Sequence, residues 1–274
     1  MKKASLLPMV FLGGILALSA AGCKSASPAD DPILQLSAEE SLAQGKDLLA
    51  KEKYSRARPY FTHAFEVEPN SAIGREGLLL AADTFYQEGS NSNYIQAEAK
   101  YRDFLNRFPT SSQAPYVQFQ IANSLAKRME KPDRDQTVTR KAVEAYEELL
   151  RLYPTSEYAA QATEQIKVVR ANLAEHEFVV GRFYQRFGIP RAATARYEFL
   201  LSEFPEYPEK DKVFFNLGLS YNSMGQPADA RKAFDRLRAD YPESPLLREI
   251  PEIREAPPAP AANPAGEPEK KAGL

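Results

Sequence analysis

The chain has 274 residues, of which 43% are hydrophobic and 26% are charged, and its formal net charge is −2. This composition is typical of a folded protein with one or two domains. No stretch has the concentrated basic charge that neutralises phosphate groups, so we do not expect nucleic acid as a partner.

Residues 1–22 have the features of a signal peptide rather than of a folded element. An apolar run over 6–18, too short to span a membrane comfortably, is followed by small residues and by the only cysteine, Cys23. This arrangement resembles a bacterial lipobox, in which the cysteine is lipidated and becomes the mature N-terminus. Ala20 stands where leucine is usual, which leaves ordinary signal-peptidase cleavage near that alanine as the alternative. Lys24 stands where an inner-membrane retention signal usually has aspartate, which favours the outer membrane.

Two polar segments flank the predicted body of the protein. Residues 23–36 are polar and interrupted by proline, and we interpret them as a lipidated tether. The part that follows the cysteine reaches at most about 45 Å when extended. Residues 245–274 are rich in proline, alanine, lysine and glutamate and lack the apolar content that stabilises a fold, so they are predicted to be disordered.

Between these segments one spacing recurs five times: an alanine, then Phe or Tyr four residues later, then proline eight residues after that. The sets are Ala57/Phe61/Pro69, Ala97/Tyr101/Pro109, Ala142/Tyr146/Pro154, Ala193/Tyr197/Pro205 and Ala230/Phe234/Pro242. Residues four apart lie on one face of a helix, and proline prevents a helix from continuing. The spacing therefore predicts an array of five helical units.

The expected helices follow in chain order. We predict helices over 37–51 and 54–67, and two more within 72–108 with a loop at 89–93. A third pair lies within 113–153 and contains a polar insertion at 130–136. An unusually long helix over 157–187 is followed by one over 191–203, and a last pair lies within 210–241.

The last unit resembles a tetratricopeptide repeat, a helix–turn–helix unit of 34 residues. The residues that match are Phe214, Leu217, Gly218, Tyr221, Gly225, Ala230, Phe234 and Pro242. Small Gly218 and Ala230 let the paired helices approach closely, and glycine suits the turn at 225. Phe214, Tyr221 and Phe234 are expected to fill the space between adjacent units. The predicted fold is therefore all-α, a superhelix of about five tetratricopeptide units over 37–244.

The sequence gives no indication of an enzyme. Its two histidines, His63 and His176, are far apart, and His176 lacks the second histidine of a zinc-protease helix. No glycine-rich phosphate loop, nucleophile elbow or metal-ligand cluster is present in the sequence. We therefore expect no catalysis, no cofactor and no metal.

Four stretches outside the generic repeat carry a closer resemblance. In their order and spacing they resemble the BamD family, the tetratricopeptide lipoproteins of the bacterial outer-membrane β-barrel assembly machinery; the stretches are 133–136, 152–159, 173–177 and 181–184. The resemblance covers roughly 37–244. It implies a lipid-anchored scaffold on the outer membrane, facing the periplasm.

The resemblance also implies partners. The last units would bind the central barrel subunit of the machinery, and accessory lipoproteins would join the complex. The first units, around 37–109, would receive unfolded outer-membrane barrel proteins. The family's arginine that pairs with an acidic residue of the barrel subunit corresponds to Arg196, and Arg191 is a second candidate of the same kind.

Two other kinds of envelope lipoprotein combine a lipobox with such repeats. One is a pilotin for pilus secretin assembly, whose repeats are usually more regular. The other is a cell-division or peptidoglycan coordinator, which normally has an N-terminal coiled coil. Docking onto another envelope machine of this kind is the alternative function.

Overall fold

The computed structural model of the chain describes residues 31–253, a part in which helices follow one another and no strand occurs. The elements are η2 (Pro32–Gln35), α1 (Ala38–Ala50), α2 (Tyr54–Val67), α3 (Ala72–Glu88), α4 (Asn91–Arg107), α5 (Ala114–Ala126), α6 (Thr137–Leu152), α7 (Ala159–Arg186), α8 (Pro190–Glu203), α9 (Lys210–Ser223), α10 (Pro227–Asp240) and η3 (Pro245–Glu249).

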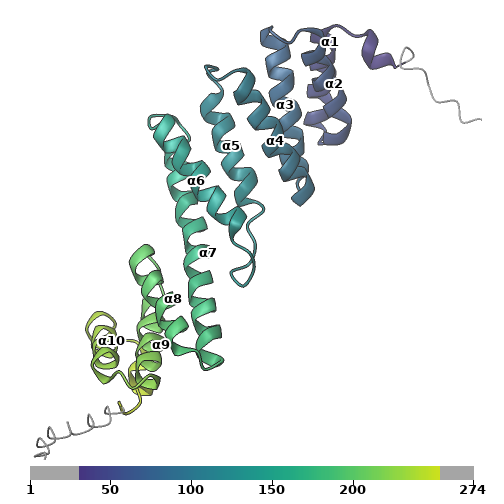
Figure 1. The fold of residues 1–274 in the computed structure, drawn as a ribbon. Coiled ribbons are helices and arrows are strands. Elements are labelled where there is room, and N and C mark those ends of the chain that lie inside the picture. The colour runs from purple at the N-terminus through teal and green to yellow at the C-terminus, as the bar shows by residue number, and fades with distance from the viewer. Residues whose placement is uncertain (1–30, 254–274) are drawn as a thin grey trace, which may run out of the picture.

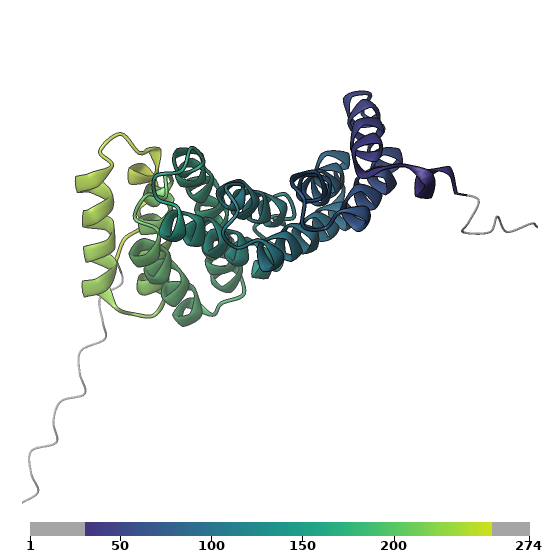
Figure 2. The ribbon, with the colours of Figure 1, turned by 90° about the horizontal axis from the view of Figure 1, so that it is seen from above.

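The helices form five antiparallel pairs, each of which packs on the next pair along the chain. The pairs are α1/α2, α3/α4, α5/α6, α7/α8 and α9/α10. The result is an elongated, curved array with the first unit at one end and the last unit at the other (Figures 1 and 2). The predicted all-α tetratricopeptide superhelix of five units is confirmed.

The recurring alanine–aromatic pairs form the centre of each unit. All five alanines and all five aromatic residues of the sets are fully buried. The second helix of each unit ends two residues before the proline of its set, as at Val67 before Pro69 and at Asp240 before Pro242. Proline thus marks the end of every unit, as its missing N–H and fixed φ require.

In three units a glycine of the first helix lies directly against the aromatic residue of the second helix. A Cβ on Gly45 would come within 2.6 Å of the Phe61 ring, and one on Gly218 within 2.5 Å of the Phe234 ring. Gly181 contacts the Tyr197 ring in the same way. Phe234 therefore fills the space inside its own unit, and the expectation that it packs between adjacent units was wrong.

The middle units have tyrosine at this position and satisfy its buried hydroxyl. Tyr101 donates to Asp83 at 2.6 Å, and Tyr146 donates to Asn123 at 2.6 Å. Tyr116 of α5 donates to the same Asp83 at 2.9 Å, so one buried carboxylate links units two and three. Burial raises the pKa of Asp83 to about 6, although both tyrosine hydroxyls oppose the shift.

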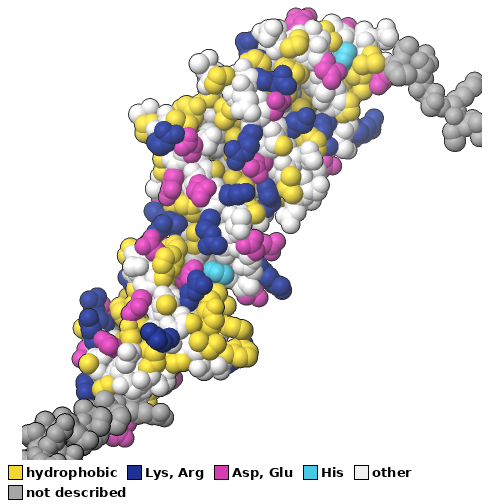
Figure 3. Space-filling view, viewed as in Figure 1, with side chains coloured by type: hydrophobic (Ala, Val, Ile, Leu, Met, Phe, Trp, Pro, Cys, Tyr) yellow, Lys and Arg dark blue, Asp and Glu magenta, His cyan; other side chains and the backbone are white. Residues whose placement is uncertain are grey.

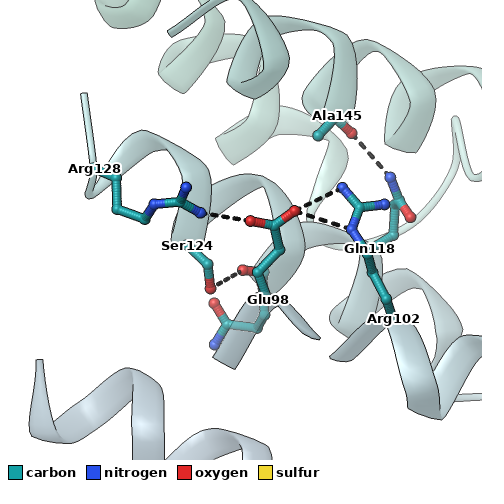
Figure 4. A network of polar contacts seen from close by, with 7 residues as sticks. Glu98, Arg102, Gln118, Ser124, Arg128 and Ala145 are labelled. Atoms are coloured by element: carbon teal, nitrogen blue, oxygen red, sulfur yellow. Dashed lines mark hydrogen bonds and ion pairs between the residues drawn. The ribbon is translucent and has the colours of Figure 1, made fainter. Parts of the chain in front are cut away.

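A second polar cluster crosses the same boundary, between α4 and α5 (Figure 4). Glu98 accepts from Arg102 of its own helix at 3.0 Å and from Arg128, two residues after the end of α5, at 2.6 Å. Within unit three, Gln118 of α5 donates to the carbonyl of Ala145 in α6 at 3.1 Å. Polar groups as well as apolar packing therefore fix unit two on unit three.

The insertion at 130–136 packs along the long helix α7. His176 Nδ1 donates to the carbonyl of Pro132 at 2.6 Å, and Asn172 donates to the carbonyl of Glu130 at 3.1 Å. Buried Gln136 donates to two carbonyls within the insertion itself. The insertion is thus an ordered part of the array, held by side chains of α7.

The structure shortens one predicted loop and shows order at the inner ends of both flanking segments. Helix α4 begins at Asn91, so only Gly89 and Ser90 connect it to α3. Residues 32–35 form η2, and His63 donates to the carbonyl of Leu36 at 3.1 Å.

At the other end, the tail was predicted to start at 245, but residues 245–249 form η3 and continue along α9. Ser244 donates to Asp211 at 2.8 Å, and Asn222 donates to the carbonyl of Glu252 at 3.1 Å. These contacts hold residues 244–252 along α9.

Candidate partner-binding site

Cys23 and the signal peptide lie outside the residues that the structure describes. Within 31–253, none of the helices combines the length and the apolar character that crossing a membrane requires. The candidate contacts within this part of the chain lie on the array itself.

Arg196 lies in the middle of α8 and forms an ion pair with Glu177 of α7. Its Nη1 atom lies 2.9 Å from Oε2 of Glu177. The Glu177 side chain is only 6% exposed, whereas that of Arg196 is 42% exposed. A buried carboxylate thus fixes one side of the guanidinium, and the remaining N–H groups are available to a second acceptor.

The placement of this pair follows from the packing of Tyr197. Glu177 lies one helical turn before Gly181, against which the Tyr197 ring packs, and Arg196 immediately precedes that tyrosine. The close approach of α7 and α8 therefore sets the distance between the two charged side chains.

Arg191 lies near the start of α8 and has a different environment. It is exposed, forms no ion pair with any described residue, and lines a surface groove of about 770 Å³ between units four and five. Glu198 and Tyr221, which are hydrogen bonded to each other, also line this groove. The structure does not bring Arg191 and Arg196 together, because Arg196 turns toward α7 and Arg191 toward α9.

The corner between α7 and α8 carries an exposed apolar patch, made of Phe183, Phe187 and Ile189. Their exposed fractions are 48%, 61% and 47%, and the rings of Phe183 and Phe187 are 4.6 Å apart. Figure 3 shows this patch as a continuous yellow area at the lower right of the array, over the C-terminal end of α7. We call it the corner patch.

In the region expected to receive clients, 37–109, two tyrosine rings pack against each other. Tyr94 of α4 packs on Tyr86 of α3 with 5.7 Å between the ring centroids. Nearby, the Arg58 guanidinium lies 3.6 Å above the Phe85 ring and pairs with Glu88. Tyr86 and Tyr94 thus pack within unit two, and Arg58 of unit one packs against unit two.

Two comparisons decide the family of this chain. A sequence model of the YfiO family, described as outer membrane lipoprotein, matches residues 35–237. The outer membrane protein assembly factor BamD of Neisseria meningitidis serogroup A is 30% identical over 260 residues, which cover 90% of this chain and 94% of that protein. The chain belongs to the BamD family.

Other relatives are more distant over similar lengths. The BamD assembly factor of Rickettsia prowazekii is 25% identical and covers 84% of this chain and 90% of its own length. The BamD assembly factor of Caulobacter vibrioides is 26% identical, and the match covers 86% of this chain and 77% of that protein. Among solved structures, the TPR2AB domain of yeast Sti1 in complex with pHSP90 aligns with a TM-score of 0.42 and 16% identity over 75% of this chain and 78% of its own.

The BamD family consists of assembly factors, and the histidines of this member have structural contacts. His63 and His176 each donate to a backbone carbonyl, as described above. No group of His, Cys, Asp or Glu in residues 31–253 could hold a metal ion.

Sequence analysis missed two features of the site in this BamD-family chain. Glu177 was not singled out, although its position one turn before Gly181 places it beside Tyr197 and hence Arg196. The corner patch was also missed, because aromatic residues at repeat spacing were interpreted as packing contacts. The i, i+4 pair of Phe183 and Phe187 at the end of a long helix was the available signal.

Proposed function

We propose that this protein is a lipid-anchored scaffold of the outer-membrane β-barrel assembly machinery. Membership of the BamD family of outer membrane protein assembly factors carries the proposal. The lipobox-like sequence that ends at Cys23 supports an anchor, and Lys24 supports sorting to the outer membrane, with the array facing the periplasm.

In this proposal Arg196 is the docking residue for the central barrel subunit. Glu177 holds the guanidinium at the surface, so less side-chain entropy is lost when a carboxylate of the partner binds to the free N–H groups. Arg191 is a second candidate contact, because it is exposed and has no ion pair among the described residues. The first units, 37–109, receive unfolded barrel proteins, and accessory lipoproteins complete the complex.

Depletion of the protein tests the function as a whole. We expect the levels of outer-membrane barrel proteins to fall and the envelope stress response to be induced, since barrels would no longer be inserted. Quantitative proteomics of isolated outer membranes measures the first effect. Unchanged barrel levels after depletion would contradict the proposal.

The docking residue needs a control for stability. Replacing Arg196 alone leaves the buried Glu177 carboxylate without its partner, which costs about 1–3 kcal/mol of unfolding free energy. The double variant Glu177→Gln/Arg196→Gln removes both charges and should recover most of that loss. We expect the single variant Arg196→Gln and the double variant to lose copurification of the barrel subunit. Glu177→Gln alone should keep most of it. Normal copurification with the double variant would exclude Arg196 as the docking residue.

Affinity purification from detergent-solubilised membranes also separates the alternative functions. A barrel subunit as the dominant partner supports the proposal. A secretin would indicate a pilotin, and a peptidoglycan synthase would indicate a cell-division coordinator.

A further inference from the structure

The corner patch has a cationic border. Arg182 and Arg186 are four residues apart on α7, as are Phe183 and Phe187, so an arginine stripe runs beside the aromatic stripe. Both arginines are exposed, and neither forms an ion pair with a described residue. The Arg186 guanidinium lies 5.5 Å from the centroid of the Phe187 ring, which places positive charge at the edge of the apolar surface.

A groove of about 640 Å³ lies along the same stripes. Its walls are formed by residues of three elements, namely Val179, Arg182, Phe183, Gln185 and Arg186 of α7, Asp133 of the insertion and Asn216 of α9. The groove thus combines apolar side chains, two cations and amide groups, with one carboxylate at its border. Such a combination resembles the centre of a protein interface, where aromatic residues and arginine contribute most of the binding energy.

We propose that the corner patch and this groove bind a segment of a partner protein in which apolar side chains are flanked by carboxylates. The apolar side chains would cover Phe183, Phe187 and Ile189. The carboxylates would pair with Arg182 and Arg186, as the unbalanced positive charge requires. This contact is separate from the Arg196–Glu177 pair. It goes beyond the proposed function because it specifies the side chains of the bound segment, and that chemistry does not depend on which partner supplies the segment.

One observation favours a protein segment over an anionic lipid surface. The arginines border a hollow, and a hollow accepts single side chains better than a flat layer of headgroups.

The test uses two synthetic peptides and the full-length protein in detergent. One peptide places leucine and phenylalanine between glutamates, and the other has lysine at every glutamate. We expect the glutamate peptide to bind, with an affinity that falls as salt rises, and the lysine peptide to bind at least about ten-fold more weakly. Fluorescence anisotropy measures both affinities.

The variants locate the binding. Phe183→Ser/Phe187→Ser and Arg182→Glu/Arg186→Glu should each weaken the glutamate peptide by roughly ten-fold or more. All four side chains are exposed, so both variants should keep the wild-type urea midpoint. Phe199→Ser, at a similarly exposed phenylalanine of α8, and Arg56→Glu, at an exposed arginine of α2, should bind like the wild type.

Equal binding of the two peptides, or patch variants that bind like the wild type, would overturn the proposal. So would patch-dependent binding to phosphatidylglycerol vesicles in place of the peptide, or self-association that the Phe variant abolishes. Since none of these measurements involves the barrel subunit, a failure of the proposed function would not affect their outcome.

Discussion

At the scale of the residue, the array depends on pairing a small side chain with a large one. Glycine at 45, 181 and 218 lets the first helix of a unit approach the aromatic ring of the second helix. Where the aromatic residue is tyrosine, its hydroxyl also needs an acceptor, and Asp83, Asn123 and Gln185 serve this purpose. The identity of the aromatic residue is thus tied to the chemistry of the facing helix.

Gly218→Ala tests this pairing. The added methyl group would lie 2.5 Å from Cε1 of Phe234, in a core that cannot expand freely. We expect a loss of about 1–3 kcal/mol in the free energy of unfolding, measured by urea denaturation. The double variant Gly218→Ala/Phe234→Leu should recover part of the loss because leucine is smaller. An unchanged midpoint for Gly218→Ala would show that α9 and α10 are not held at this distance.

At the scale of the element, polar groups specify how neighbouring units stack. Asp83 of α3 accepts from Tyr101 of α4 and from Tyr116 of α5, while Glu98 of α4 pairs with Arg128 just after α5. Both contacts require one particular register between units two and three, because a shift along α5 would separate Tyr116 from Asp83 and Arg128 from Glu98. Apolar packing alone would constrain the register less strongly.

The carboxyl group of Asp83 should make stability depend on pH. Folding raises the pKa of Asp83 from 3.8 to about 6 because burial disfavours the charged form. Between these values the folded state binds more protons than the unfolded state, so the unfolding free energy falls as the pH rises from about 4 to 6. The contribution is at most about 3 kcal/mol, fully present below pH 4 and lost above the folded pKa.

Asp83→Asn isolates this contribution from those of other groups. The asparagine carbonyl can still accept from the tyrosines, but it does not titrate. Subtracting urea-derived stabilities of the variant from those of the wild type at each pH should give a difference that falls between pH 4 and 7. A flat difference would mean that Asp83 has the same pKa in both states.

The long helix α7 belongs to the same scale. Asn172 and His176 hold the insertion after α5, whereas Gly181 and Glu177 contact α8. One helix thus connects unit three to unit four, and its length follows from having to pack on both. In its final turn Gln185 accepts from Tyr197 of α8, whereas Phe183 lies on another face of the helix and remains exposed, as does Phe187.

At the scale of the whole molecule, the array separates its two ends. The described chain begins next to unit one and ends next to unit five, so an anchor at Cys23 would attach the array by its first unit (Figure 1). Residues 32–36 pack against α2, which leaves 23–31 as the remaining length of the proposed tether. Nine residues reach at most about 30 Å.

Cys23→Ala tests the anchor. The proposed acyl chains supply the attachment, so without them we expect the mature protein in the soluble periplasmic fraction after membranes are washed with carbonate. Cell fractionation and immunoblotting measure the distribution, with Ser25→Ala as the membrane-bound control. A Cys23→Ala protein that resists the wash would show that another element holds it to the membrane.

The sequence by itself determined the array: five alanine–aromatic–proline sets predicted five helical pairs, and the long helix and the insertion were found at the expected places. Such features depend on residues close together in the chain, where helix periodicity and proline sterics act. Two aspects of the site depended on the tertiary structure, namely the pairing of Arg196 with Glu177 and the exposure of Phe183 and Phe187. Sequence spacing predicts which face of a helix a side chain occupies, but the neighbouring unit determines whether that face is covered.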